Sequence, residues 1–466
     1  MFEQLRDLRD RHGYEVCAVV SGTSGELVAK LNGAGITVQA ADFGFAGLHD
    51  LWVLPWKIAR LTRFFRREGI DVVQTHLFHS MVIGRFAAWL ALVPVRLTMV
   101  AGPFHLEAYT PRWIDRCTYW MDTKLIASCE YTRRLYREMG VSERRLALVY
   151  YGPDAARFDP SRTEPARIRE EYGWAPDTPV IGMVAYFYPS FVPNRWTPPA
   201  LWGRSTKGHE YLIRAMPTVL GEFPTVKCLL VGSGWEQQGA KHMTEMRELV
   251  HALGLEESVV FAGFRADANS LLRAMNVSVQ PSLSENLGGT IESLLMECPT
   301  VATRVGGMPD SVRDGETGVL VASADPDDLA RGILELLRDP GRARALARTG
   351  RKLMLERFTL RTTVDDLDGL YREGMARTGN RRQGFRDVRS LVRCLVAAPV
   401  AAYLVLRLVL VDVLWLPRWD AGWRPWHLAS VRRVASRIYR ASRRLLPNTK
   451  VVLLWDRFFA KIRGRH

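Results

Sequence analysis

The sequence predicts an α/β protein with two successive parallel sheets. Three observations support this fold class. Short apolar strands alternate with helices of about ten or more residues, which is typical of βαβ units. The alternation is interrupted once, by a passage rich in Pro and Asp at residues 152–178, and then restarts. Finally, 466 residues, 47% of them apolar and 24% charged, have a globular composition and are too many for one ordinary core.

The first half reads as helix 2–12, strand 15–20, helix 25–35, strand 36–40, helix 54–69, strand 71–76 and helix 84–93. Gly13 ends the first helix. Because the chain begins on a helix, the leading strand of such a sheet and the loop after it are either missing or supplied differently. We expect either that the true start lies upstream or that the protein lacks that loop.

The second half continues the alternation after residue 178. Strands are predicted at 179–186, 226–234, 258–263 and 277–282, with helices at 209–223, 246–254 and 268–275 and another after Gly289. One segment, residues 188–205 (YPSFVPNRWTPPALWGRS), is rich in Pro and Trp and lengthens a strand-to-helix connection. Long loops inside compact domains usually have a function.

The spacing of the cysteines and the start of the chain argue against a zinc site and a signal peptide. The six cysteines are far apart, without a C-x-x-C pair or a His at metal-ligand spacing, which predicts reduced thiols and no zinc site. The first 13 residues are charged throughout and contain no apolar run, so no signal peptide is predicted. The cysteines are Cys17, Cys117, Cys129, Cys228, Cys298 and Cys394.

The stretch PSLSENLGGTIESLLMECP, residues 281–299, combines two glutamates with a Gly-Gly pair. A helix is predicted from Gly289-Thr290 to the stop at Pro299, and a helix start attracts phosphate. Gly288 and Gly289 lack the Cβ atoms that would keep phosphates from the backbone N–H groups. Glu292, one turn into the helix, has the chemistry to accept hydrogen bonds from ribose hydroxyls. The alternative for a lone glutamate is a surface helix whose early Glu complements the helix dipole.

The next loops carry glycines as well, in TRVGGMPDSVRDGETGVLV at 303–321. Residues 281–321 together resemble the donor-binding signature of the retaining GT-B glycosyltransferases of family 4. Other segments also resemble this family, in chain order DVVQTHLFHSMVIGR, LIASCEYTRRLYREMGV, LVYYGPDAARFDP and KGHEYLIRAM. The resemblance covers about residues 5 to 375.

The resemblance implies two facing Rossmann-like domains with parallel sheets. Residues 1–160 would form the acceptor-binding domain, without its first strand, and residues 161–360 the nucleotide-sugar-binding domain. Residues 361–380 would form a crossover helix, followed by a helical, basic, Trp-rich tail at 381–466.

The family's functional residues map onto this chain as follows. Glu292 corresponds to the ribose-binding glutamate, and Glu285 to the glutamate that contacts the donor sugar, although their interval is one residue shorter than in the family. Lys207 resembles the lysine that neutralises the diphosphate; without that context it would be a solvated charge. Arg204 is the nearest arginine before it. The remaining donor-binding candidates are Gly288, Gly289, Thr290, Gly306 and Gly307.

His105 follows the predicted strand that ends in LTMVAG, where the family places a histidine near the transferring sugar. An isolated histidine is more often structural. The resemblance implies that His105, Glu285 and Lys207 carry catalysis, with no cofactor and no metal.

The implied reaction is transfer of a sugar from a nucleoside diphosphate sugar to a lipid-linked or saccharide acceptor with retention, in polysaccharide or glycolipid biosynthesis. Two alternatives stay open. One is a sugar-nucleotide epimerase of the same fold, and the other is a catalytically inactive binder of nucleotide sugars.

The C-terminal tail holds most of the excess positive charge. Residues 418–466 contain 13 Lys and Arg against two Asp, a net charge of 13 − 2 = +11, interleaved with tryptophans. The longest uncharged run nearby, 394–406, has 13 residues and is too short to span a bilayer. We predict a peripheral anionic membrane contact, hence a cytoplasmic protein on the inner face of the cell membrane. A helical cap on the first domain is the alternative. Nucleic-acid binding is not expected, because no such motif accompanies the charge.

Overall fold

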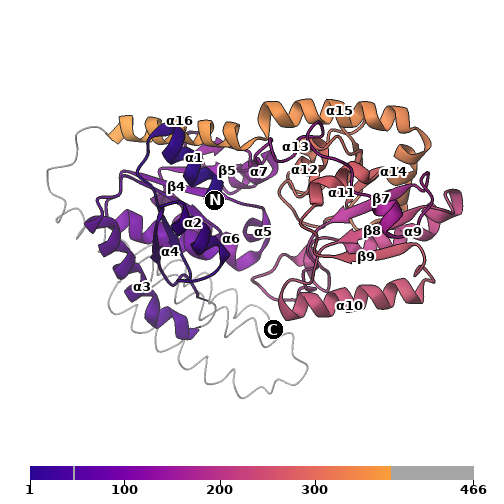
Figure 1. The fold of residues 1–466 in the computed structure, drawn as a ribbon. Helices are drawn as coiled ribbons and strands as arrows, with labels where there is room; N and C mark the ends of the chain where they lie inside the picture. Colours follow the sequence, from indigo (N-terminus) through magenta and orange to yellow (C-terminus); the bar gives the residue numbers. More distant parts are fainter. Residues whose placement is uncertain (46–47, 379–466) are drawn as a thin grey trace, which may run out of the picture. The chain divides into compact units, whose positions relative to one another are not determined.

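The structure, a computed structural model, describes residues 1–45 and 48–378 of the chain. Strands alternate with helices through both halves (Figure 1), as the sequence predicts. The first half contains α1 (Phe2–His12), β1 (Cys17–Val20), α2 (Glu26–Gly33), β2 (Thr37–Ala40), α3 (Leu48–Arg67), β3 (Val72–His76), α4 (Phe78–Leu90), β4 (Val95–Val100), α5 (Phe104–Glu107), α6 (Tyr109–Thr118), β5 (Lys124–Ala127), α7 (Glu130–Glu138) and β6 (Leu146–Leu148).

The strands of the first half form two sheets, where the sequence predicted one. β3, β4, β5 and β6 form a four-stranded parallel sheet, while β1 pairs in parallel only with β2. No strand of the described residues joins the two. Helix α1 packs against both instead, since Phe2 and Leu5 contact the cluster around Ala18 of β1, and Leu8 lies in the cluster that includes Leu97 of β4.

The second half forms a single sheet. Its elements are α8 (Ile168–Glu171), β7 (Val180–Val184), α9 (His209–Glu222), β8 (Lys227–Val231), α10 (Glu236–Ala252), β9 (Val259–Gly263), α11 (Ala268–Ala274), β10 (Val277–Gln280), α12 (Thr290–Leu295), β11 (Thr300–Thr303), α13 (Met308–Ser311), β12 (Val319–Val321), α14 (Pro326–Arg338) and α15 (Pro340–Arg357).

The strand order of this sheet is β12-β11-β10-β7-β8-β9, and every pair is parallel. All residues of β10, β11 and β12 are buried, because helices cover both faces. The order runs outward in both directions from the adjacent strands β7 and β10. In such doubly wound sheets ligands bind at this switch point, beyond the carboxyl ends of the strands.

The last described helix, α16 (Leu360–Thr378), returns to the first half. Val364, Leu367 and Tyr371 of α16 lie in the same hydrophobic cluster as Leu97 of β4, and the Tyr371 hydroxyl donates to Gln74 Oε1 at 2.6 Å. Within residues 1–45 and 48–378, no helix is long and apolar enough to cross a membrane. The predicted tail at 381–466 lies outside the described residues.

The cysteines in the described part of the chain are free, as predicted. Burial raises the pKa of the Cys228 and Cys298 thiols to about 12. These thiols are therefore protonated at neutral pH. Residues 1–45 and 48–378 also contain no group of three or more His, Cys, Asp or Glu side chains arranged to hold a metal ion.

Candidate functional site

The loops that follow β7 and β10 meet at the switch point of the second sheet. The loop after β7 ends at Lys207 and Gly208, the residue before α9, and the loop after β10 contains residues 281–289. Leu283 N donates to Thr206 O at 2.8 Å, so the two loops are bonded to each other. Gly208 has φ 73°, and a Cβ there would lie 2.1 Å from Pro281 O. Only glycine permits this approach.

Lys207 and Glu285, one from each loop, form an ion pair. Lys207 Nζ donates to Glu285 Oε2, and both side chains are 19% exposed. The other oxygen, Oε1, accepts from Asn286 N at 3.0 Å. Burial lowers the pKa of Lys207, but the Glu285 carboxylate raises it more, so the net direction is upward. Lys207 is therefore a firmly charged ammonium group, as a role on a diphosphate requires.

Glu292 lies near this pair but is bonded to neither residue. Its Oε2 is buried and has no hydrogen-bond partner among the described residues. Burial raises the pKa of Glu292 above its ordinary value, and a hydrogen bond from its own backbone N–H and the charge on Lys207 only partly oppose this effect. Buried side-chain oxygens nearly always have a partner in native structures. An unpartnered one beside a charged lysine is suited to accept hydrogen bonds from a ligand's hydroxyl groups.

The predicted helix after Gly289 begins where the sequence indicated, at Thr290, but ends at Leu295 instead of continuing to Pro299. The Thr290 hydroxyl bonds Leu287 O and lies 2.7 Å from Ser311 Oγ. The side chain of Thr290 is therefore buried and engaged within the protein.

The glycines of the signature allow close contacts between protein loops. Gly306 has φ 53°, and a Cβ there would lie 1.7 Å from Glu285 O. At Gly307 a Cβ would lie 2.4 Å from Cys129 Cβ, and at Gly289 it would lie 2.9 Å from Gln280 Nε2. At Gly288 it would lie 3.0 Å from the Glu285 side chain. The sequence predicts that Gly288 and Gly289 allow phosphate to approach the backbone; the structure supplies a second reason for glycine at both positions, which is packing against Glu285 and Gln280.

A cleft of about 890 Å³ adjoins the ion pair. It contains Gly306 and Arg204 of the predicted residues, but not Lys207, Glu285 or Glu292. Arg204 is exposed, and its guanidinium has no ion pair within the described part of the chain. The cleft is lined by Glu107, Glu130, Tyr131, Arg134, Arg137, Ala200, Arg204, Leu283, Arg304, Val305, Gly306, Pro309, Asp310, Ser323 and Ala324.

His105 lies in α5, which contacts the loop that holds Glu285. Glu107 of the same helix accepts from Ser284 Oγ at 2.6 Å. A Cβ on Gly102, just before α5, would lie 3.8 Å from Asn286 Cβ. The four-residue helix therefore lies against the loop of Glu285, while the His105 ring itself contacts Asp115 and Phe78.

Comparison with known proteins agrees with this geometry. The family described as "Glycosyl transferases group 1" matches residues 200–339, and the "Glycosyl transferase 4-like domain" matches residues 2–152. The D-inositol 3-phosphate glycosyltransferase of Acidothermus cellulolyticus is 30% identical over 66% of this chain and 68% of its own length. The chain belongs to the group 1 glycosyltransferases.

Other similar proteins support the same family. The putative glycosyltransferase EpsD of Bacillus subtilis is 29% identical to this group 1 glycosyltransferase over 67% of the chain and 73% of its own length. In fold, the crystal structure of Anabaena Alr3699/HepE in complex with UDP is similar, with a TM-score of 0.64, 19% identity and coverage of 80% of this chain and 94% of that one. The expected GT-B fold and transferase class are thus confirmed.

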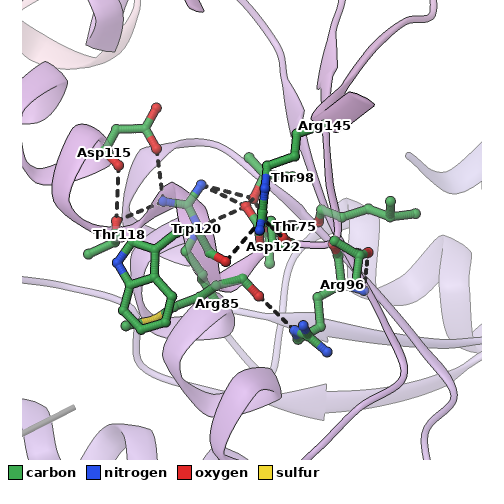
Figure 2. A network of polar contacts seen from close by, with 12 residues as sticks. Thr75, Arg85, Arg96, Thr98, Asp115, Thr118, Trp120, Asp122 and Arg145 are labelled. Atoms are coloured by element: carbon green, nitrogen blue, oxygen red, sulfur yellow. Dashed lines mark hydrogen bonds and ion pairs between the residues drawn. The ribbon is translucent and has the colours of Figure 1, made fainter. Parts of the chain in front are cut away.

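The glycosyltransferase also contains a buried ionic network that sequence reasoning missed. Arg85 of α4 has a fully buried side chain and pairs at 2.8 Å with both Asp115 and Asp122 (Figure 2). It also donates to Thr118 Oγ1 at 2.7 Å. One signal was available in the sequence, because Arg85 is the only charge in the apolar run 81–90 (MVIGRFAAWL). A charge in such a run requires a buried partner.

The Pro/Trp segment 188–205 of the glycosyltransferase packs against the same region of the first half. The Phe191 and Phe104 rings lie 5.3 Å apart, and the Trp196 and Phe78 rings 6.4 Å apart. Thr110 N donates to the carbonyl oxygen of Arg195 at 3.0 Å. These contacts place the segment beside α5 and α6, next to His105.

Proposed function

We propose that this glycosyltransferase moves a sugar from a nucleoside diphosphate sugar to a saccharide or lipid-linked acceptor with retention at the anomeric carbon, in polysaccharide or glycolipid biosynthesis. The observation that carries the proposal is the meeting of the Lys207–Glu285 pair and the unpartnered Glu292 carboxylate at the switch point of the second sheet. The positive lysine suits the diphosphate of a nucleotide sugar, and the carboxylates suit the hydroxyl groups of its ribose and its sugar.

Breaking the bond between sugar and diphosphate develops negative charge on the leaving group. Fixed positive charge at that position lowers the barrier, because it needs no reorganisation during the reaction. Lys207 supplies this charge, and Arg204 at the edge of the cleft can add to it. Glu292 accepts hydrogen bonds from the ribose hydroxyls, and Glu285 holds Lys207 and faces the donor sugar.

The names of similar proteins include different nucleotides. Anabaena Alr3699/HepE has been crystallised with UDP-glucose, and a mannosyltransferase of Mycolicibacterium smegmatis that is 30% identical over 50% of this chain is named GDP-mannose-dependent. These names support a nucleoside diphosphate sugar as donor. They leave the base and the sugar to experiment.

Isothermal titration with UDP-, GDP- and ADP-sugars tests the donor site. We expect Glu292→Gln to weaken binding of the accepted donor about tenfold or more, because hydrogen bonds to a charged group contribute about 1.5–3 kcal/mol. Glu297→Gln is the matched control, since Glu297 follows closely in sequence but lies 3.8 Å from Arg351. Equal donor affinity in wild type and Glu292→Gln would contradict the proposal.

Product analysis tests the reaction. We expect nucleotide release to depend on an acceptor, and the NMR coupling of the new anomeric proton to match that of the donor. Release of an altered nucleotide sugar without acceptor would indicate an epimerase, and binding without turnover an inactive binder. We also propose that no metal is required, so excess EDTA should leave the rate unchanged.

We propose that the basic tail at 381–466 contacts the anionic inner face of the cell membrane. The support is its charge and tryptophan content, since these residues lie outside the described structure. We expect the full chain to float with anionic liposomes and not with neutral ones, and a chain ending at Gly379 to float with neither. Equal flotation of both chains would exclude the tail as the anchor.

A further inference from the structure

The buried network around Arg85 reaches His105 through Asp115. Asp115 Oδ1 accepts from Arg85 Nη1 at 2.8 Å. Its second oxygen, Oδ2, accepts from the Tyr136 hydroxyl at 2.7 Å and lies 3.4 Å from His105 Nε2. One carboxylate therefore links a buried arginine to His105, which lies in the helix that contacts the Glu285 loop.

Asp115 carries a permanent negative charge. Its side chain is fully buried, which by itself would raise its pKa, but Arg85 together with His105 and Tyr136 outweighs this effect and lowers the pKa of Asp115 to about 2. Both of its oxygens face donors: Arg85 on one side, Tyr136 and His105 on the other. The carboxylate can act toward His105 only as a hydrogen-bond acceptor.

The two ring nitrogens of His105 have different surroundings. Nε2 is buried and makes no hydrogen bond of good geometry, although Asp115 Oδ2 lies 3.4 Å away, within hydrogen-bond distance. Such bonds often tighten only when substrate binds. Nδ1 has no hydrogen-bond partner within the described residues, although the ring keeps 11% of its surface exposed. A carboxylate beside Nε2 favours the proton on that nitrogen.

We propose that Asp115 is a positioning residue that holds His105 as its Nε2–H tautomer, so that Nδ1 presents a lone pair to a hydroxyl of the bound sugar or acceptor. The catalytic consequence rests on the proposed function, whereas the tautomer does not. Arg85 keeps Asp115 charged and fixes its orientation. Phe78, whose ring centroid lies 5.8 Å from that of His105, packs against the ring and limits its rotation.

The tautomer can be measured in the wild-type protein without substrate. The full chain is labelled with ¹⁵N-histidine, and the signals of His105 are assigned by their loss in His105→Gln. Spectra are recorded at increasing pH until the ring carries a single proton, and we expect long-range ¹H–¹⁵N couplings to place that proton on Nε2. A single proton on Nδ1 would overturn the proposal. This arm holds even if a variant of Asp115 fails to fold.

Asp115→Asn tests the cause, and Asp122→Asn is its matched control. Each substitution removes the charge of one carboxylate that pairs with the buried Arg85, but Asp122 has no contact with His105. In Asp115→Asn the amide group can donate to Nε2 and move the proton to Nδ1. We expect a reversed tautomer and a kcat about 100-fold lower, with KM for the donor changed less than about threefold. Asp122→Asn should keep the wild-type tautomer and a kcat within about threefold of wild type.

The two proposals fail separately. If no nucleotide sugar supports transfer, the proposed function is wrong, and the ¹⁵N spectra of wild type and Asp115→Asn still decide the role of Asp115. If transfer occurs but folded Asp115→Asn keeps both the wild-type tautomer and the wild-type kcat, the positioning role is wrong and the glycosyltransferase assignment stands. An equal loss of kcat in Asp115→Asn and Asp122→Asn would show a purely structural role and overturn the proposal.

Discussion

Replacing Lys207 with Met separates its role on the substrate from its role in the fold. The methionine keeps most of the side-chain volume but removes the ammonium group, which donates a hydrogen bond to Glu285. Two losses are expected. The protein loses stability because a part-buried carboxylate remains without its partner. The reaction loses the positive charge that would stabilise the negative diphosphate as it leaves.

The structure sets the size of both losses. The Lys207 and Glu285 side chains are 19% exposed, which lies between a surface pair, contributing about 0–1 kcal/mol, and a fully buried one, whose breaking costs about 3–5 kcal/mol. We expect the free energy of unfolding to fall by about 2 kcal/mol. Loss of one preorganised donor costs about 3 kcal/mol of transition-state stabilisation. Because about 1.4 kcal/mol corresponds to tenfold, kcat/KM should fall by about two orders of magnitude.

The double variant Lys207→Met/Glu285→Gln distinguishes the two effects. Removing the carboxylate charge as well should restore most of the unfolding free energy, measured by urea denaturation. It should not restore turnover, measured as nucleotide release in the presence of acceptor. Recovery of kcat/KM together with stability would refute the reasoning, because Lys207 would then act only by holding Glu285. Wild-type turnover in Lys207→Met itself would refute it more directly.

Three further perturbations test the fold around the site. Burial lowers the pKa of His209 to about 3. Between that value and its ordinary pKa, the unfolded chain binds a proton that the folded chain does not, so the free energy of unfolding should fall by about 1.4 kcal/mol for each unit as the pH decreases from about 6 to 4. His209→Gln should reduce this slope in urea titrations. Arg85→Met leaves two buried carboxylates unpaired and should lower the unfolding free energy by about 3–5 kcal/mol, whereas a loss under 1 kcal/mol would contradict a paired role. Phe191→Ala removes the ring contact with Phe104; we expect a loss of about 1 kcal/mol in stability and greater protease sensitivity in segment 188–205, and unchanged proteolysis would argue against its docking.

Much of the second half of the fold was predictable because its strands are buried on both faces. Runs such as VKCLLV and VSVQ are nearly continuous in buried residues, and such runs are recognisable without knowing their neighbours. The split of the first half into two sheets was less accessible. Strand pairing depends on which strands are adjacent in space, and nothing in the residues of β1 and β2 indicates that they pair only with each other.

The candidate site, like the fold, was predictable only in part. The sequence motif predicted the separate roles of Lys207, Glu285 and Glu292, but not that the first two form an ion pair across 78 positions of the chain. That contact depends on β7 and β10 being neighbours, which only the sheet order reveals. Arg85 and Asp115 are 30 positions apart on different helices, and their pairing has no periodic signal. Long-range polar contacts were therefore the part that residue patterns could not supply.

In the proposed function, Lys207 binds a diphosphate although it is already paired with Glu285. Lys207 is held by Glu285, and Oε2 of Glu292 has no hydrogen-bond partner among the described residues, so one carboxylate already balances the lysine charge. A diphosphate that approaches must compete with Glu285 for the same ammonium group, and an arginine such as Arg204 can offset the additional negative charge. We propose that binding exchanges one carboxylate for the diphosphate at Lys207 and releases Glu285 toward the sugar. Under this proposal the charged lysine is already paired and oriented before the donor arrives, and the glutamate becomes available only when a donor is present.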